Sequence, residues 1–143
     1  MKVVAIVQAR SSSVRLPGKV MRRIGQTPLI GVLLKRLLQA KRVDQIVVAT
    51  SDTESDRELK KYVEDLGFHV TVGHLQDVLS RYVKAVADTN ADVVVRITGD
   101  CPLVDADLVD AAVDAFVHHQ VDYLSNVEPH TFPDGLDIEV FWA

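Results

Sequence analysis

Short apolar runs rich in valine and isoleucine recur along the chain. The runs at 3–7, 46–49 and 93–97 are almost continuously apolar, without alternation between inward and outward positions. Strands that are covered on both faces have this pattern, and the strands of parallel sheets are covered in this way. Two further runs, at 70–72 and 138–141, complete the set of expected strands.

Amphipathic segments between these runs predict helices. Apolar residues recur every three to four positions within 29–38, 59–66, 78–86 and 108–117, which places them on one face of a helix. Alternating strands and helices form a mostly parallel sheet with helices on both faces. The expected architecture is therefore a three-layer α/β/α arrangement in a single domain that takes in residues 1–143.

The composition of the chain excludes several classes of function. The chain has 143 residues, of which 48 % are hydrophobic and 25 % charged, and its net charge is −4. This is the balance of one globular domain, and a mildly acidic protein is a poor general binder of nucleic acid. No apolar run is long enough for a membrane span or a signal peptide, and the single cysteine, Cys101, excludes an internal disulfide. A cytoplasmic protein is the default expectation.

A loop rich in cations and hydroxyl groups follows the first strand, at 8–19. Ligands of open parallel sheets bind at the carboxyl ends of the strands. Arg10, Arg15 and Lys19 suit phosphate oxygens, and the backbone N–H groups of 11–13 add donors. The loop matches neither a Walker A loop nor a G-x-G-x-x-G fingerprint. A phosphate site and a solvated basic loop are about equally favoured.

A glycine and an aspartate follow the strand at 93–97. Gly99 permits a close approach of the backbone to a neighbour, and Asp100 stands where a hard oxygen ligand for Mg²⁺ belongs. A lone aspartate after a strand more often forms a turn or a helix cap, but the presence of the cationic loop makes a metal site more favoured. Cys101 has no evident activating base and is expected to be a small buried residue.

Acidic residues in two other segments leave structural and functional interpretations open. Asp77 and Arg81, four residues apart on a predicted helix, either pair with each other or face a ligand. Asp134, Asp137 and Glu139 form either a turn that leads into a polar strand face or a rim that orients a hydroxyl-rich acceptor.

Five segments, in order along the chain, carry a family resemblance. They are Gln8-Ala9-Arg10 with Arg15-Leu16-Pro17-Gly18-Lys19, Val48-Ala49-Thr50-Ser51-Asp52, Asp77-Val78-Leu79-Ser80-Arg81-Tyr82, Arg96-Ile97-Thr98-Gly99-Asp100-Cys101-Pro102-Leu103 and Phe132-Pro133-Asp134-Gly135-Leu136-Asp137-Ile138-Glu139. The chain resembles the cytidylyltransferase family of the spore coat polysaccharide biosynthesis protein F type. That group is similar to the CMP-Kdo synthetases and the acylneuraminate cytidylyltransferases. The resemblance covers the whole chain, and the ordered set is more specific than any single motif.

The resemblance implies a Rossmann-like nucleotidyltransferase fold of the GT-A-like type. It implies that Lys19, Arg10 and Asp100 act in catalysis and that Asp100 binds Mg²⁺, the expected cofactor. The implied nucleotide-binding residues are Ala9 (whose backbone would lie against the cytosine), Arg10, Ser11, Arg15, Lys19, Asp77, Arg81 and Thr98. The implied sugar-binding residues are Asp134, Asp137 and Glu139.

The implied activity is transfer of CMP from CTP to a sugar or sugar acid, with release of pyrophosphate, for surface polysaccharide synthesis. Ser11, Val14 and Ser80 depart from the usual residues of the family. Family members continue past this length and carry a second acidic metal ligand there. The chain is therefore expected to be an N-terminal portion that forms a homodimer to cover its exposed edges.

Two alternatives to an active cytidylyltransferase remain open. One is a catalytically incomplete fragment that still binds nucleotide. The other, less favoured, is a flavodoxin-like binding or signalling domain, which would carry acidic residues where Arg10 stands.

Overall fold

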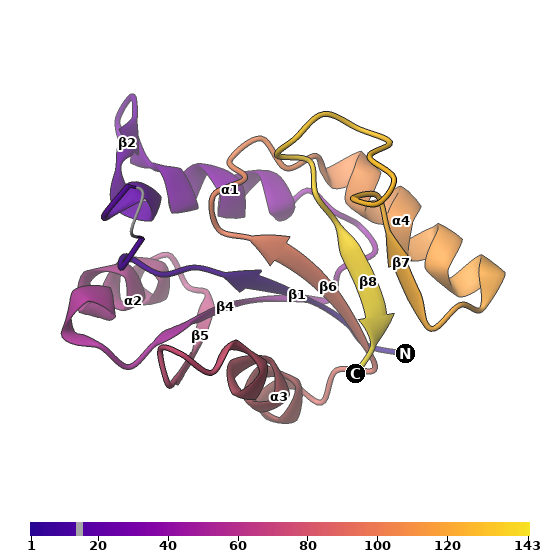
Figure 1. The fold of residues 1–143 in the computed structure, drawn as a ribbon, viewed down its shortest axis with the longest axis horizontal. Coiled ribbons are helices and arrows are strands. Elements are labelled where there is room, and N and C mark those ends of the chain that lie inside the picture. Colours follow the sequence, from indigo (N-terminus) through magenta and orange to yellow (C-terminus); the bar gives the residue numbers. More distant parts are fainter. Residues whose placement is uncertain (14–15) are drawn as a thin grey trace.

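The computed structural model describes residues 1–13 and 16–143. Within these residues, six strands form one sheet in the order β5-β4-β1-β6-β8-β7 (Figure 1). The strands are β1 (Val3–Gln8), β4 (Gln45–Ser51), β5 (His69–Gly73), β6 (Val93–Thr98), β7 (Tyr123–Ser125) and β8 (Glu139–Trp142). A separate hairpin consists of β2 (Arg23–Ile24) and β3 (Thr27–Pro28). Strands this short leave no hydrophobic pattern, so the sequence did not predict the hairpin.

The centre of the sheet is parallel, as the continuous apolar runs predicted. β1 pairs in parallel with β4 and β6, and β4 pairs in parallel with β5. At the other end, β8 runs antiparallel to β6, and β7 antiparallel to β8. Residues 4–7 of β1 have no exposed surface, because both faces of the sheet are covered there. The expected α/β fold with a mostly parallel sheet is confirmed.

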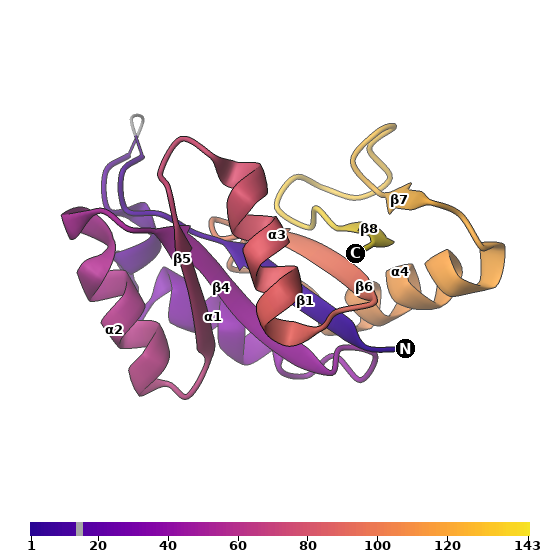
Figure 2. The ribbon, with the colours of Figure 1, turned by 90° about the horizontal axis from the view of Figure 1, so that it is seen from below.

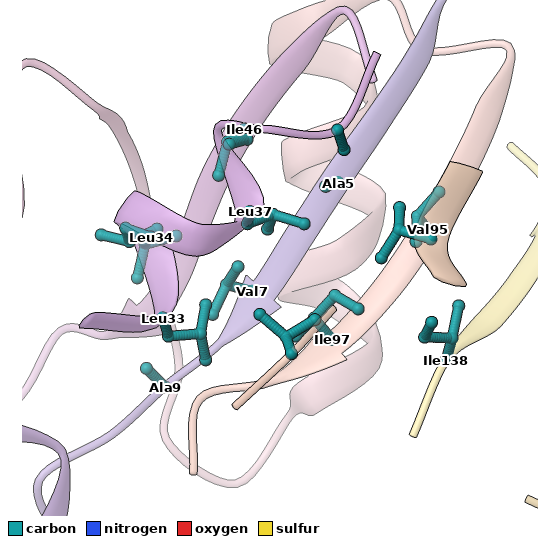
Figure 3. Close-up of a cluster of buried hydrophobic side chains, with 14 of the residues drawn as sticks. Ala5, Val7, Ala9, Leu33, Leu34, Leu37, Ile46, Val95, Ile97 and Ile138 are labelled. Carbon is teal, nitrogen blue, oxygen red and sulfur yellow. The ribbon is translucent and has the colours of Figure 1, made fainter. Parts of the chain in front are cut away.

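Helices cover the two faces of the sheet unequally. The α-helices of the described residues are α1 (Leu29–Leu37), α2 (Arg57–Asp65), α3 (Val78–Thr89) and α4 (Ala106–His119). Apolar side chains of α1, α2 and α4 join one hydrophobic cluster with one face, whereas α3 packs on the other face. Figure 2 shows α3 in front of the strands, with α1 and α4 behind them. In Figure 3, Leu33 and Leu37 of α1 lie over Ala5 and Val7 of β1.

Aspartate side chains cap the N-termini of α3 and α4. Asp77 accepts a hydrogen bond from the Ser80 backbone N–H at 2.9 Å and caps α3. Asp105 accepts one from the Leu108 backbone N–H at 3.0 Å and caps α4. Each bond satisfies a backbone donor that the first helical turn leaves free. In the part of the chain that the structure describes, no helix has the length and apolar composition needed to cross a bilayer.

The strand order creates an opening beside the end of β1. The chain moves from β1 to β4 and β5 on one side, then returns to β6 on the other side of β1. Ligands of open sheets bind where the order reverses in this way. The Gly99 N–H donates to the Gln8 carbonyl at 2.8 Å, and a Cβ on Gly99 would lie 2.6 Å from the Ala9 Cβ. The close approach expected at this glycine is therefore to the end of β1.

Candidate functional site

A pocket of about 300 Å³ opens where the strand order reverses. Its walls come from the first loop and from the residues at the end of β6. The lining residues are Gln8, Ala9, Arg10, Ser13, Lys19, Val20, Arg96, Thr98, Gly99 and Asp100. The structure therefore brings the cationic loop and Asp100 into one cavity, although Lys19 and Asp100 are 81 positions apart in the sequence. Arg15 lies outside the described residues.

An ion pair joins the two walls of the pocket. The Lys19 Nζ donates a hydrogen bond to the Asp100 Oδ2. Their side chains are 24 % and 41 % exposed, so a ligand in the pocket can reach both. Partial burial would by itself raise the pKa of Asp100, but the hydrogen bond and charge of Lys19, together with a hydrogen bond from Thr98, hold the pKa below its ordinary value. Asp100 is therefore ionised at neutral pH, as a metal ligand must be.

A buried carboxylate holds the first loop from behind. Asp56, at the end of the short 3₁₀ helix η2 (Glu54–Asp56), accepts a hydrogen bond from the Ser11 backbone N–H at 2.6 Å. It also accepts hydrogen bonds from the backbone N–H and the hydroxyl of Ser51. Sequence reasoning passed over Asp56, because no local pattern shows that a residue 45 positions away contacts it.

A second ion pair lies beside the pocket, on the face of the sheet that α3 covers. Arg96 of β6 stands opposite Glu139 of β8, and its Nη1 donates to the Glu139 Oε1. Burial raises the pKa of the neighbouring Tyr82 to about 12, against the opposing effect of Arg96. Arg96 lines the pocket, so its bond to Glu139 places Glu139 next to the pocket. The sequence analysis assigned no role to Arg96.

Asp77 and Arg81 do not line the pocket, and in the described structure they do not form an ion pair with each other. Asp77 caps α3. The side chain of Arg81 is buried, and its Nη1 donates to the carbonyls of His74 and Leu75 at 2.8 and 3.0 Å. Burial and the nearby Arg10 lower the pKa of Arg81. Arg81 therefore lies close to the first loop while its bonds fix the segment before α3.

The three acidic residues assigned to the sugar side are dispersed. The side chain of Asp134 is 94 % exposed, and the pocket-lining residues do not include it. Asp137 lies near Cys101, whose thiol is buried as expected; burial raises the pKa of that thiol. Only Glu139 contacts a residue of the pocket wall among the described contacts.

The donor set of the pocket limits which metal it suits. The described residues contain no group of three or more His, Cys, Asp or Glu side chains that could hold an ion alone. Mg²⁺ commonly binds one or two carboxylates and completes its shell with water and substrate phosphates. Asp100, an ionised carboxylate that faces a cationic loop, fits that mode of binding.

Comparison with known proteins gives consistent matches. A family model described as cytidylyltransferase matches residues 4–132. The chain is 39 % identical over 125 residues to the spore coat polysaccharide biosynthesis protein SpsF of Bacillus subtilis, with coverage of 85 % of this chain and 52 % of the relative. A cytidylyltransferase structure from Leptospira borgpetersenii serovar Hardjo-bovis matches with a TM-score of 0.95 at 38 % identity, covering 99 % of this chain and 60 % of that one.

A more distant structural match extends to a protein with bound nucleotide. The structure of CMP:2-keto-3-deoxy-manno-octonic acid synthetase complexed with CTP has a TM-score of 0.80 at 20 % identity, covering 99 % of this chain and 74 % of that one. This match shows a shared nucleotidyltransferase fold. The chain spans about half the length of the curated relatives it matches. Because the family model covers most of its residues, the chain belongs to the cytidylyltransferase family.

Proposed function

We propose that the protein is a Mg²⁺-dependent cytidylyltransferase that transfers CMP from CTP to a sugar or sugar acid and releases pyrophosphate. One observation carries this proposal: Arg10 and Lys19 share a pocket with the ionised Asp100 at the reversal of strand order. Cations that bind phosphate oxygens and a carboxylate that suits Mg²⁺ are the groups that nucleotidyl transfer needs.

The reaction requires positioning and charge stabilisation. A hydroxyl of the acceptor releases its proton to solvent as its oxygen forms a new bond to the α-phosphorus, the bond from that phosphorus to the bridging oxygen breaks, and pyrophosphate leaves. Arg10 and Lys19 would hold the β and γ phosphates and stabilise the charge on the departing pyrophosphate. Mg²⁺ bound at Asp100 would supply charge neutralisation at the phosphate oxygens.

The names of relatives support the substrate classes. A relative that is 35 % identical, from Bdellovibrio bacteriovorus, is a 3-deoxy-manno-octulosonate cytidylyltransferase, and the Bacillus subtilis relative is named for polysaccharide biosynthesis. These names favour CTP as donor, a sugar or sugar acid as acceptor and a place in surface polysaccharide synthesis. They also favour a cytoplasmic enzyme, because nucleotide donors are made there.

A thermal-shift panel tests the nucleotide. Ligand that binds the native state raises the melting temperature, so CTP with Mg²⁺ should raise it more than UTP, ATP or GTP with Mg²⁺. Equal shifts for all four nucleotides, or none, would contradict cytidine specificity. A pyrophosphate-release assay with candidate sugars then measures transfer.

The alternative is binding without transfer. It is favoured by the single carboxylate on the pocket wall among the described residues, because the family resemblance implies a second acidic metal ligand. Saturable CTP binding with no pyrophosphate release for any sugar or sugar acid would select this alternative.

A further inference from the structure

Asp56 has an unusual position for a carboxylate. It is 1 % exposed, and it lies outside the pocket. Burial of a carboxylate is costly unless hydrogen bonds compensate for the lost water. Two backbone N–H groups and one hydroxyl supply these bonds: Ser11 N at 2.6 Å, Ser51 N at 3.3 Å and Ser51 Oγ. The bonds connect the end of β4 with the first loop.

The backbone of Ser11 joins Asp56 to the rest of the loop. Its N–H donates to Asp56, and its carbonyl accepts hydrogen bonds from Ser13 N at 2.9 Å and from Gly18 N at 2.8 Å. The Gly18 bond brings the two ends of the loop together. Arg10 directly precedes Ser11, and Lys19 directly follows Gly18. A single anchor at Ser11 therefore fixes the backbone beside both pocket cations.

Asp56 also balances charge behind the loop. The buried guanidinium of Arg81 lies near Arg10, and the charge of Arg10 contributes to the lowered pKa of Arg81. The charge of Asp56 acts in the opposite direction on that pKa and so partly offsets the effect of Arg10. Removal of Asp56 would increase the net repulsion between the guanidinium groups of Arg10 and Arg81, which favours movement of Arg10 away from its place in the pocket.

We propose that Asp56 is a positioning residue, which sets Arg10 and Lys19 for a triphosphate through its hydrogen bond to Ser11. The proposal rests on the function assigned to the pocket above. Asp56 does not touch the ligand; it acts through the loop backbone. Hydrogen bonds that involve a charged group are stronger than neutral ones, so loss of this one should change affinity by about tenfold or more.

The test compares three variants with the unchanged protein. Asp56→Ala removes the anchor, and Asp56→Asn keeps the side-chain shape and one acceptor oxygen. Asp110→Ala is the matched control, because Asp110 likewise accepts hydrogen bonds from two loop amides, Lys41 N at 2.9 Å and Arg42 N at 2.8 Å, away from the pocket. Titrations with CTP and with inorganic tripolyphosphate, each with Mg²⁺, measure the dissociation constants.

We expect Asp56→Ala to weaken binding of both ligands by about tenfold or more, and Asp56→Asn to weaken it by less. Asp110→Ala should stay within about twofold of the unchanged protein. Binding by Asp56→Ala within twofold of the control would overturn the proposal. If Asp56→Ala does not fold, Asp56→Asn bears the same comparison, with a loss of at least threefold expected.

A second measurement needs no nucleotide and separates this inference from the proposed function. Backbone amide exchange at Ser11 and Gly18 should be faster in Asp56→Ala than in Asp110→Ala, because the first variant frees the loop. Equal exchange rates in the two variants would contradict the proposal that Asp56 holds the loop. If the unchanged protein binds neither CTP nor tripolyphosphate, the proposed function fails, and the exchange rates alone decide the role of Asp56.

Discussion

Lys19 and Asp100 connect the first loop with the end of β6 through one ion pair. Replacement of either residue by alanine should lower turnover by at least about a hundredfold, since loss of one charged contact in the transition state costs roughly 2–4 kcal/mol. Both side chains are partly exposed, so stability should change by less than about 1 kcal/mol. Pyrophosphate release and a thermal melt measure the two effects. Release at the original rate by either variant would remove that residue from its role.

The charge state of Asp100 depends on the same pair. Burial favours the neutral acid, and Lys19 supplies the largest of the opposing contributions, so Lys19→Ala should raise the pKa of Asp100. A lowered pKa in the folded state adds stability at neutral pH, and that stability is lost as the pH falls below about 4. Carboxyl-carbon NMR titration of the two proteins measures the shift. An unchanged midpoint would show that Lys19 does not control this carboxylate.

At the scale of elements, Gly99 fixes the distance between the ends of β1 and β6. A Cβ there would lie 2.6 Å from the Ala9 Cβ and 2.8 Å from the Gln8 carbonyl oxygen, and a backbone atom cannot move aside easily. Gly99→Ala should therefore cost about 1–3 kcal/mol of stability and also weaken CTP binding, because both walls of the pocket shift. Urea unfolding and CTP titration measure these effects.

Gly31→Ala is the control for this prediction. A Cβ on Gly31 of α1 would meet the side chain of Tyr62 of α2, and neither residue lines the pocket. It should lower stability and leave CTP affinity unchanged. Equal affinities for Gly99→Ala and Gly31→Ala would show that the spacing of β1 and β6 does not set the pocket.

The elements were more predictable than the contacts between them. The apolar runs at 3–7, 46–49 and 93–97 became buried parallel strands, because continuous hydrophobicity reports burial on both faces. The rule that ligands bind at carboxyl ends of strands brought the first loop and Asp100 together in advance. Contacts such as Ser11 with Asp56 follow from tertiary register, which no local pattern contains.

At the scale of the whole molecule, one edge of the sheet carries exposed aromatic side chains. β7 is the outermost strand of the sheet, and Tyr123 and Trp142 beside it are 54 % and 45 % exposed. Edges and apolar surface of this kind favour association, so we predict a homodimer in light scattering at tens of micromolar. Tyr123→Lys should shift the equilibrium toward monomer. A monomer at that concentration in the unchanged protein would contradict the prediction.

The pairing of β1 with β6 also has a consequence for synthesis of the chain. The Gln8 carbonyl and the Gly99 N–H that close the pocket floor are about 90 residues apart, so their meeting closes a long loop at an entropic cost. When a ribosome has synthesised only the first half of this chain, the cationic loop exists but the opposite wall of the pocket does not. If the pocket binds nucleotide as proposed, nucleotide would not stabilise that half, and ligand protection against proteases would begin only once β6 has emerged and paired.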